Sequence, residues 1–149
     1  MSKIIIGSDH GGYSLKEKIK EVFSKCGYEF EDVGTFSEAS CDYPLYAEKV
    51  AKKVVETQGR GVLVCGTGIG MSIAANKFKG IRAAHCTDTF SAQMTREHND
   101  SNILCLGERI TDTDLALDIV KIWLETAFSE GERHINRIKL IKDIEDKNI

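Results

Sequence analysis

Short runs of apolar, β-branched residues alternate along this chain with longer segments in which apolar residues recur every three or four positions. The short runs predict buried strands, and the longer segments predict amphipathic helices. We expect strands at Lys3–Ser8, Tyr28–Val33, Gly61–Cys65, Ile81–His85 and Asn102–Leu106. We expect helices at Tyr13–Cys26, Tyr43–Thr57, Gly68–Phe78, Asp88–Glu97 and Asp112–Phe128. These βα units predict a three-layer α/β/α domain with a five-stranded parallel, Rossmann-like sheet in flavodoxin-like order.

The C-terminal segment predicts an additional helix, Glu132–Lys147, after Gly131. Helices already cover both faces of the expected sheet, so the apolar side chains of this tail need another surface, and a second copy of the chain is one candidate. They are Ile135, Ile138, Leu140, Ile141 and Ile144. The sequence contains no linker and no internal repeat, so residues 1–149 are expected to form one domain, with 131–149 as its helical tail.

Composition argues against several classes of function. The 20 basic and 23 acidic residues are nearly balanced, which argues against a nucleic-acid partner or a membrane surface and favours small-molecule chemistry. No apolar stretch approaches the ~18 residues of a membrane span, and the N-terminus enters a strand at once, so we expect a cytoplasmic protein. The five cysteines include no C-x-x-C pair, which predicts reduced thiols rather than disulfides or a zinc site.

The ends of the first and third expected strands carry the candidate chemistry. Parallel sheets bind ligands beyond the carboxyl ends of their strands, and flavodoxin-like order makes these two strands neighbours. Asp9 and His10 follow the first strand between glycines, and Cys65 ends the third, so all three are expected in one crevice. A cap on the following helix is the alternative role for Asp9.

The segment Cys65-Gly66-Thr67-Gly68-Ile69-Gly70 predicts an anion cradle at the start of a helix. Glycines let backbone N–H groups approach a ligand closely, and a helix N-terminus favours negative charge. A thiol there is stabilised as a thiolate, so Cys65 is a candidate base for proton transfer. The alternative is that Cys65 only fills the core. We interpret Cys26, Cys86 and Cys105 as core thiols and Cys41 as a loop thiol.

Further candidates lie in the second half of the chain. His98 and Asn99 end the fourth expected helix, where the helix dipole favours a protonated histidine that can act as a general acid. Arg109 follows the fifth strand, and Arg133 and Arg137 share one face of the tail helix. Three arginines aimed at one crevice would bind a phosphate through forked hydrogen bonds.

Taken together, these motifs resemble the type B ribose-5-phosphate isomerases, a family that also includes galactose-6-phosphate and allose-6-phosphate isomerases. The resemblance runs through nearly the whole chain and rests on Ser8-Asp9-His10-Gly11-Gly12, Asp42-Tyr43-Pro44, Cys65 to Lys77, Ser91-Ala92-Gln93, His98-Asn99-Asp100 and Gly107-Glu108-Arg109. Some members carry a glutamate base farther along the glycine segment. Ala74 and Ala75 stand there in this chain, which favours the cysteine branch.

The resemblance implies an aldose–ketose isomerase of the pentose phosphate pathway that needs no cofactor and no metal. It implies that Cys65 moves a proton between C1 and C2 through a cis-enediolate and that His98 opens the furanose ring. The other implied roles are sugar binding by Asp9, Tyr43 and Asn99, and enediolate stabilisation by Thr67 and the amides of Gly68 to Gly70. Substrate contacts are also implied for His10, Gly66 and Ile69, and phosphate binding for His10, Arg109, Arg133 and Arg137. The family is dimeric with shared sites, with a tetramer as the alternative.

Two readings from other classes stay open at this point. One is a nucleotide-binding or regulatory module. It is suggested by Asp88, which lies about 20 residues beyond Gly68, as the ribose-binding acid does in dinucleotide sites, although Met71 replaces the third glycine of that motif. Alternatively, Cys65 and His98 would form the nucleophile and base of a cysteine hydrolase.

Overall fold

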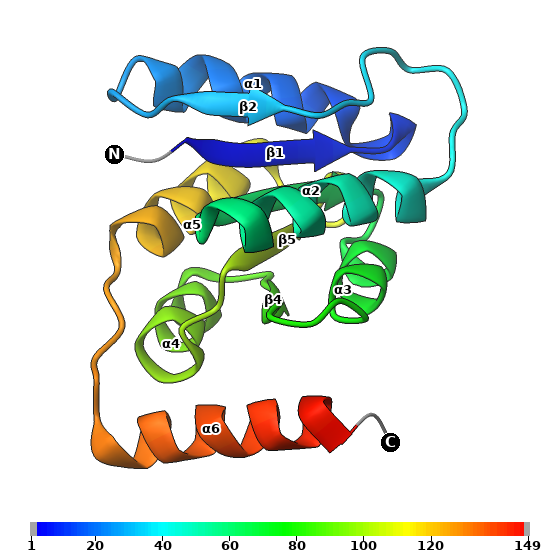
Figure 1. Cartoon of the computed structure of the whole chain (residues 1–149). Helices are drawn as coiled ribbons and strands as arrows, with labels where there is room; N and C mark the ends of the chain where they lie inside the picture. The colour runs from blue at the N-terminus through cyan, green and yellow to red at the C-terminus, as the bar shows by residue number, and fades with distance from the viewer. Residues whose placement is uncertain (1–2, 148–149) are drawn as a thin grey trace.

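The computed structural model describes residues 3–147 and contains every predicted strand and helix (Figure 1). Its elements are β1 (Ile4–Ser8), η1 (His10–Gly12, a 3₁₀ turn), α1 (Tyr13–Ser24), β2 (Phe30–Asp32), α2 (Tyr43–Thr57), β3 (Arg60–Cys65), α3 (Ile69–Ala75), β4 (Ala83–His85), α4 (Thr89–Asn99), β5 (Ile103–Gly107), α5 (Thr113–Glu125) and α6 (Glu132–Lys147). The predictions for α2 and α6 match in both bounds. The third helix, α3, is shorter than expected, with seven residues.

The sheet is parallel throughout, in the order β2-β1-β3-β5-β4. The predicted neighbours β1 and β3 are confirmed. The flavodoxin-like order differs at one end, because β5 lies between β3 and β4. The physical reason is hydrophobicity: every residue of β5 is buried, whereas the three residues of β4 are only half-buried and suit an edge.

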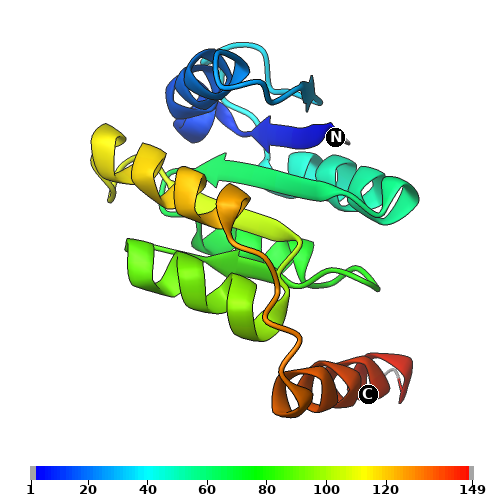
Figure 2. The same cartoon turned by 90° about the vertical axis from the view of Figure 1, so that its left-hand side faces the viewer.

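Successive residues of the strands supply the two halves of the core. Ile4, Ile6, Val62 and Val64 face α1 and α5, whereas Ile5, Leu63 and Cys65 face α2 and α3. Figure 2 shows these layers on either side of the sheet. The alternation directs Cys65 toward α3, where its neighbours are Met71 and Ala75.

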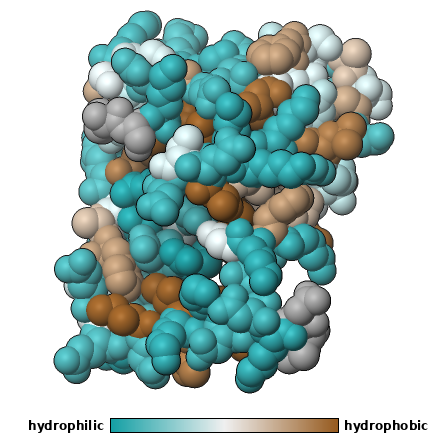
Figure 3. Space-filling view, in the orientation of Figure 1, coloured by the Kyte–Doolittle hydropathy of each residue, from teal (hydrophilic) through white to brown (hydrophobic). Residues whose placement is uncertain are grey.

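The tail helix α6 lies at the edge of the molecule (Figures 1 and 2) and contacts the helix α4, where His134 stacks on His98. Its apolar residues Ile135, Leu140, Ile141 and Ile144 are all about half exposed, as expected for a helix that lacks a surface to cover. A groove of about 680 Å³ lies between α6 and the β4 edge. Figure 3 shows hydrophobic side chains at the surface along α6.

None of the helices within residues 3–147 combines the length and the hydropathy that crossing a membrane requires.

A buried ion pair fixes the end of β2. Lys16 on α1 is completely buried, and its ammonium bonds the carboxylate of Asp32, which Lys20 also reaches at 2.7 Å. The other oxygen of Asp32 accepts the Gly34 amide at 2.8 Å. Burial raises the pKa of Asp32, but the hydrogen bonds from Lys16, Lys20 and Gly34 outweigh it and lower this pKa below its usual range.

We expect Asp32→Asn to lower the free energy of unfolding at pH 7 by about 3 kcal/mol, because it leaves the buried Lys16 ammonium with only the more exposed carboxylate of Glu17, at 3.2 Å, as its ionic partner. A carboxylate with a lowered pKa stabilises the fold above its unfolded-state pKa of about 3.9 and loses this effect as the pH falls through the folded-state pKa. The difference from wild type should therefore shrink below about pH 4. Urea unfolding at several pH values measures it.

Glu31→Gln is the matched control, since Glu31 pairs with Lys53 at the surface and should contribute less than about 1 kcal/mol. Equal losses for the two variants would contradict this account of Asp32.

Candidate active site

The carboxyl ends of β1, β3 and β5 lie side by side at one edge of the sheet, where the sequence analysis expects the crevice. Asp9 Oδ1 accepts the Gly12 amide at 3.1 Å, so the capping role of Asp9 is correct. A Cβ placed on Gly11 would lie 3.3 Å from Asp9 Oδ1, from a guanidinium nitrogen of Arg109 and from the Gly66 amide. Asp9 therefore caps η1 and also borders the crevice with Arg109.

Cys65 ends β3 with its sulfur inside the glycine turn. The Gly68 amide donates to Sγ at 3.1 Å, and an N–H directed at sulfur stabilises negative charge on it. Gly68 has φ 81°, a left-handed conformation that favours glycine. Because α3 is short, the cradle consists of the turn amides rather than of a long helix dipole.

Thr67 lies beside this sulfur and keeps a free proton. Its hydroxyl oxygen accepts the Ile69 amide at 3.3 Å. A hydroxyl that accepts one bond still has its O–H to donate, and Thr67 is exposed at the mouth of the turn. Thr67 can therefore donate to a ligand oxygen placed above Cys65.

Close backbone packing holds the turn on β5. A Cβ on Gly107 would lie 2.4 Å from the Thr67 carbonyl carbon, and one on Gly12 would lie 2.4 Å from that of Val64. The Glu108 and Arg109 amides donate to the carbonyl oxygens of Cys65 and Gly66 at 2.9 Å. These contacts bring the Arg109 guanidinium over Gly66.

The loop before α2 closes the crevice from another side. His10 Nδ1 accepts the Cys41 amide at 3.2 Å, so Nε2 carries the proton of the neutral ring. The ring of Tyr43 lies against Gly70, since a Cβ there would be 2.6 Å from it. Cys41 is thus more than a simple loop thiol: its backbone orients His10.

Sequence reasoning assigned no role to Glu108, although it quoted the residue in a motif. Its carboxylate accepts the Leu15 amide of α1 at 2.6 Å and ties α1 to the end of β5. Only the tertiary structure reveals this contact, because the two residues are 93 positions apart.

The remaining predicted residues gather at the opposite edge of the sheet. His98 lies in the last turn of α4, as predicted, and stacks on His134 of α6 with ring centroids 4.1 Å apart. Arg133 Nε donates to His134 Nε2 at 3.4 Å. Burial, together with His98, Arg133 and Arg137, lowers the pKa of His134 below that of an ordinary histidine. The sequence prediction did not include His134. Its position between Arg133 and Arg137 on the tail helix is the feature that could have identified it.

Two groups of predicted residues therefore exist in one chain. We call them the carboxyl-edge group (Asp9, His10, Tyr43, Cys65–Gly70 and Arg109) and the amino-edge group (His98, Asn99, Arg133 and Arg137). The strands separate the two by roughly 15 Å, because α4 runs back from the carboxyl edge to the amino edge. In Figure 1 the strands point right, toward α3, whereas α6 begins at the left. One chain alone does not bring Cys65 and His98 together, so a hydrolase dyad does not form within one chain.

Two further predictions have clear outcomes. Asp88 Oδ1 accepts the Ser91 amide at 2.6 Å, so this carboxylate caps α4. Cys86 and Cys105 are buried, as expected, and burial raises the pKa of both thiols. The prediction for Cys26 is wrong: this thiol is exposed, because α1 ends at Ser24 and Cys26 lies in the following turn.

Comparisons with known proteins relate the chain to sugar-phosphate isomerases. The family model described as Ribose/Galactose Isomerase matches residues 4–141. The chain is 47% identical over 149 residues to ribose-5-phosphate isomerase B of Escherichia coli, covering 99% of both proteins. It matches the structure of Clostridium thermocellum ribose-5-phosphate isomerase B with a TM-score of 0.96 and 54% identity, over 99% of this chain and 100% of that chain. The Mycoplasma genitalium ribose-5-phosphate isomerase B structure with bound ribulose-5-phosphate matches with a TM-score of 0.92 and 37% identity, over 97% and 96%.

We expect Gly107→Ala to lower the free energy of unfolding by about 1–3 kcal/mol, since the added methyl overlaps the Thr67 backbone and must displace the turn. The displaced turn should also expose Cys65, so this variant should react faster with a thiol reagent at Cys65. Denaturant unfolding and site-resolved alkylation measure the two effects. A variant with unchanged stability and unchanged Cys65 reactivity would contradict the packing described here.

Proposed function

The chain belongs to the ribose/galactose isomerase family and is an aldose–ketose isomerase of sugar phosphates, and we propose that it interconverts ribose 5-phosphate and ribulose 5-phosphate within the pentose phosphate pathway. The observation that carries this proposal is the Cys65 sulfur, held by the Gly68 amide at the carboxyl end of β3 beside Thr67, Asp9 and Arg109. The relative with bound ribulose-5-phosphate supports the choice of a pentose phosphate.

In this proposal Cys65 is the base. As a thiolate it removes the proton from C2 of the open-chain aldose. The electron pair of the broken C–H bond forms the C1–C2 double bond of a cis-enediolate, while the π pair of the C1=O bond moves onto O1. The thiol then returns the proton to C1, which gives the ketose. The isomerisation neither gains nor loses atoms or electrons, and the proton on O2 moves to O1 in the same sequence.

The negative charge of the enediolate requires donors that are already in place. The Thr67 hydroxyl donates its free proton to an enediolate oxygen, and the turn amides around Gly70 face the same position. Asp9 keeps its second carboxylate oxygen for a sugar hydroxyl, because only Oδ1 is used by Gly12. Removal of one such oxyanion donor typically costs ~10²–10³ in rate.

Ring opening and phosphate binding use both edges of the sheet. His98 transfers the proton that opens the furanose, and Asn99 holds a sugar oxygen. The phosphate contacts Nε2–H of His10 and the guanidinium of Arg109, and the two tail arginines complete the clamp. Since the amino-edge group lies far from Cys65 in its own chain, we propose that a second copy supplies it.

The second copy also accounts for the exposed face of α6. Its isoleucines and the groove beside β4 provide an apolar surface that pairing of two chains would bury. Such a dimer contains two identical sites, each built from the carboxyl-edge group of one chain and the amino-edge group of its partner.

Cys65→Ala tests the base. We expect loss of ribose 5-phosphate isomerisation by at least about a thousandfold with the fold retained, because alanine packs at this strand end but accepts no proton. The assay uses purified protein in the presence of a chelator, with allose 6-phosphate and galactose 6-phosphate as competing substrates.

Cys105→Ala is the matched control, since it removes a buried thiol on the neighbouring strand and should keep activity. Retention of more than a few per cent of wild-type rate by Cys65→Ala would end the assignment. Faster turnover of a hexose phosphate by wild type would replace the substrate and leave the base in place.

Mixing two inactive variants tests the shared site. Cys65→Ala chains and Arg133→Ala/Arg137→Ala chains, after subunit exchange, should form heterodimers with one intact site and one doubly defective site. Activity should return to about a quarter of wild type for an equal mixture. Native mass spectrometry verifies the exchange.

The control mixes equal amounts of wild type and a chain that carries all three substitutions. Shared sites predict about a quarter of wild-type activity, below the half expected from dilution alone, because each site of a heterodimer then lacks one of the two groups. Verified heterodimers without recovered activity would mean that each chain builds its own site.

A further inference from the structure

The last turn of α4 is held from outside by an arginine that precedes β4. Arg82 Nε donates to the Asn99 carbonyl oxygen and Nη2 to the Asp100 carbonyl oxygen, both at 2.9 Å. Nη2 also lies 3.6 Å from the Asp100 carboxylate. One planar guanidinium therefore bonds two of the carbonyl groups that a helix end leaves without partners.

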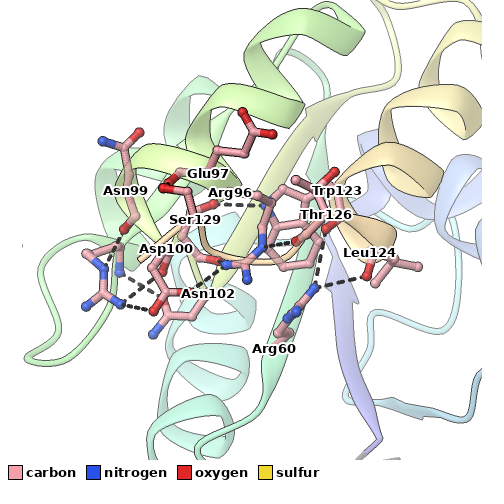
Figure 4. Close-up of polar contacts among 12 residues, drawn as sticks. Arg60, Arg96, Glu97, Asn99, Asp100, Asn102, Trp123, Leu124, Thr126 and Ser129 are labelled. Carbon is pink, nitrogen blue, oxygen red and sulfur yellow. Dashed lines mark hydrogen bonds and ion pairs between the residues drawn. The ribbon is translucent and has the colours of Figure 1, made fainter. Parts of the chain in front are cut away.

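A second arginine fixes the residue that ends the helix. Asp100 has φ 44° and ψ 48°, the left-handed conformation of a helix C-cap. Arg96 Nη1 bonds the Asp100 carboxylate at 2.9 Å and the Ser101 carbonyl oxygen at 2.6 Å (Figure 4). Arg96 is buried, so this contact holds the chain where it leaves α4.

The segment that leads to the tail holds the same turn from another direction. The Ser129 hydroxyl donates to the Glu97 carbonyl oxygen at 2.7 Å, and its amide donates to that oxygen at 3.3 Å (Figure 4). This contact places α6 so that His134 stacks on His98. The carbonyl oxygens of Glu97, Asn99 and Asp100 thus all have donors from outside the helix.

We infer that Arg82 is a positioning residue for the sugar-opening end of α4: its bonds to the Asn99 and Asp100 carbonyl oxygens hold the orientation in which His98 and Asn99 meet the substrate. This inference rests on the proposed function, because it assumes that His98 opens the sugar ring. Within the part of the chain that the structure describes, the Arg82 side chain bonds only the end of α4, so it acts through His98 and Asn99.

The chain provides a matched comparison in Arg60. Arg60 Nη1 donates to the carbonyl oxygens of Trp123 at 3.3 Å and Leu124 at 3.1 Å, at the end of α5 (Figure 4). Arg60 and Arg82 thus perform the same chemistry at the same edge of the sheet, for different helices. Of these two helices, only α4, whose end Arg82 bonds, carries predicted site residues.

The test compares Arg82→Met with Arg60→Met on two substrates. Ribose 5-phosphate must be opened, whereas 4-deoxyribose 5-phosphate lacks the hydroxyl that closes a furanose and enters already open. Arg82→Met should lower kcat/KM about 10–100-fold on ribose 5-phosphate, because a misplacement of His98 by about 1 Å can cost roughly 10² in rate. The loss on the open-chain probe should be clearly smaller, because that substrate still contacts Asn99 but needs no ring opening by His98. Arg60→Met should change both substrates alike. Arg82→Lys, which cannot bond both carbonyl groups with one planar fork, should show an intermediate and equally selective loss.

A second measurement needs no turnover. The His98 ring signals in NMR should shift and broaden in Arg82→Met and stay unchanged in Arg60→Met. Equal loss on both substrates, or unchanged His98 signals in Arg82→Met, would overturn the inference. Failure of the proposed function appears separately, as absence of wild-type activity on ribose 5-phosphate, and the NMR comparison still decides whether Arg82 orients His98.

Discussion

The contact between the glycine turn and the end of β5 is the constraint on which the rest of the site depends. Gly107 leaves no space for a side chain beside the Thr67 carbonyl, and only this approach brings the Arg109 guanidinium over Gly66. The same turn directs the Gly68 amide at the Cys65 sulfur. A thiol, an arginine and a carboxylate therefore share one crevice because three strand ends are packed backbone to backbone.

The structure separates the tasks of the reaction between the two edges of the sheet. Proton transfer belongs to the carboxyl edge, where Cys65 is nearly buried. The histidine and the tail arginines gather at the amino edge, where the ends of α4 and α5 require cations for their carbonyl groups. A single chain cannot join these edges, since the sheet lies between them, and this geometry is the main argument for a site shared by two copies.

Buried and half-buried charges perform mainly structural work in this fold. Asp32 is paired from α1 and holds the start of the loop that reaches His10, while Arg60 and Arg96 bond carbonyl oxygens at helix ends. None of these roles was visible in the sequence, where each residue looks like an ordinary surface charge. Their partners lie up to 64 positions away along the chain, so only folding reveals them.

The sequence by itself determined the elements and the first half of the site. Short apolar, β-branched runs and period-3.6 patterns placed five strands and six helices, because burial of apolar faces is a local property of the pattern. Motifs at the ends of β1 and β3 placed Asp9 beside Cys65, since parallel strands end at one edge.

Tertiary structure alone decided the position of β5 inside the sheet, the exposure of Cys26 and the pairing of Glu108 with the α1 backbone. It also decided that His98 and Cys65 lie on opposite edges of one chain. The physical reason is that strand order, helix ends and long-range hydrogen bonds depend on which surfaces meet, and residue spacing along the chain does not record that.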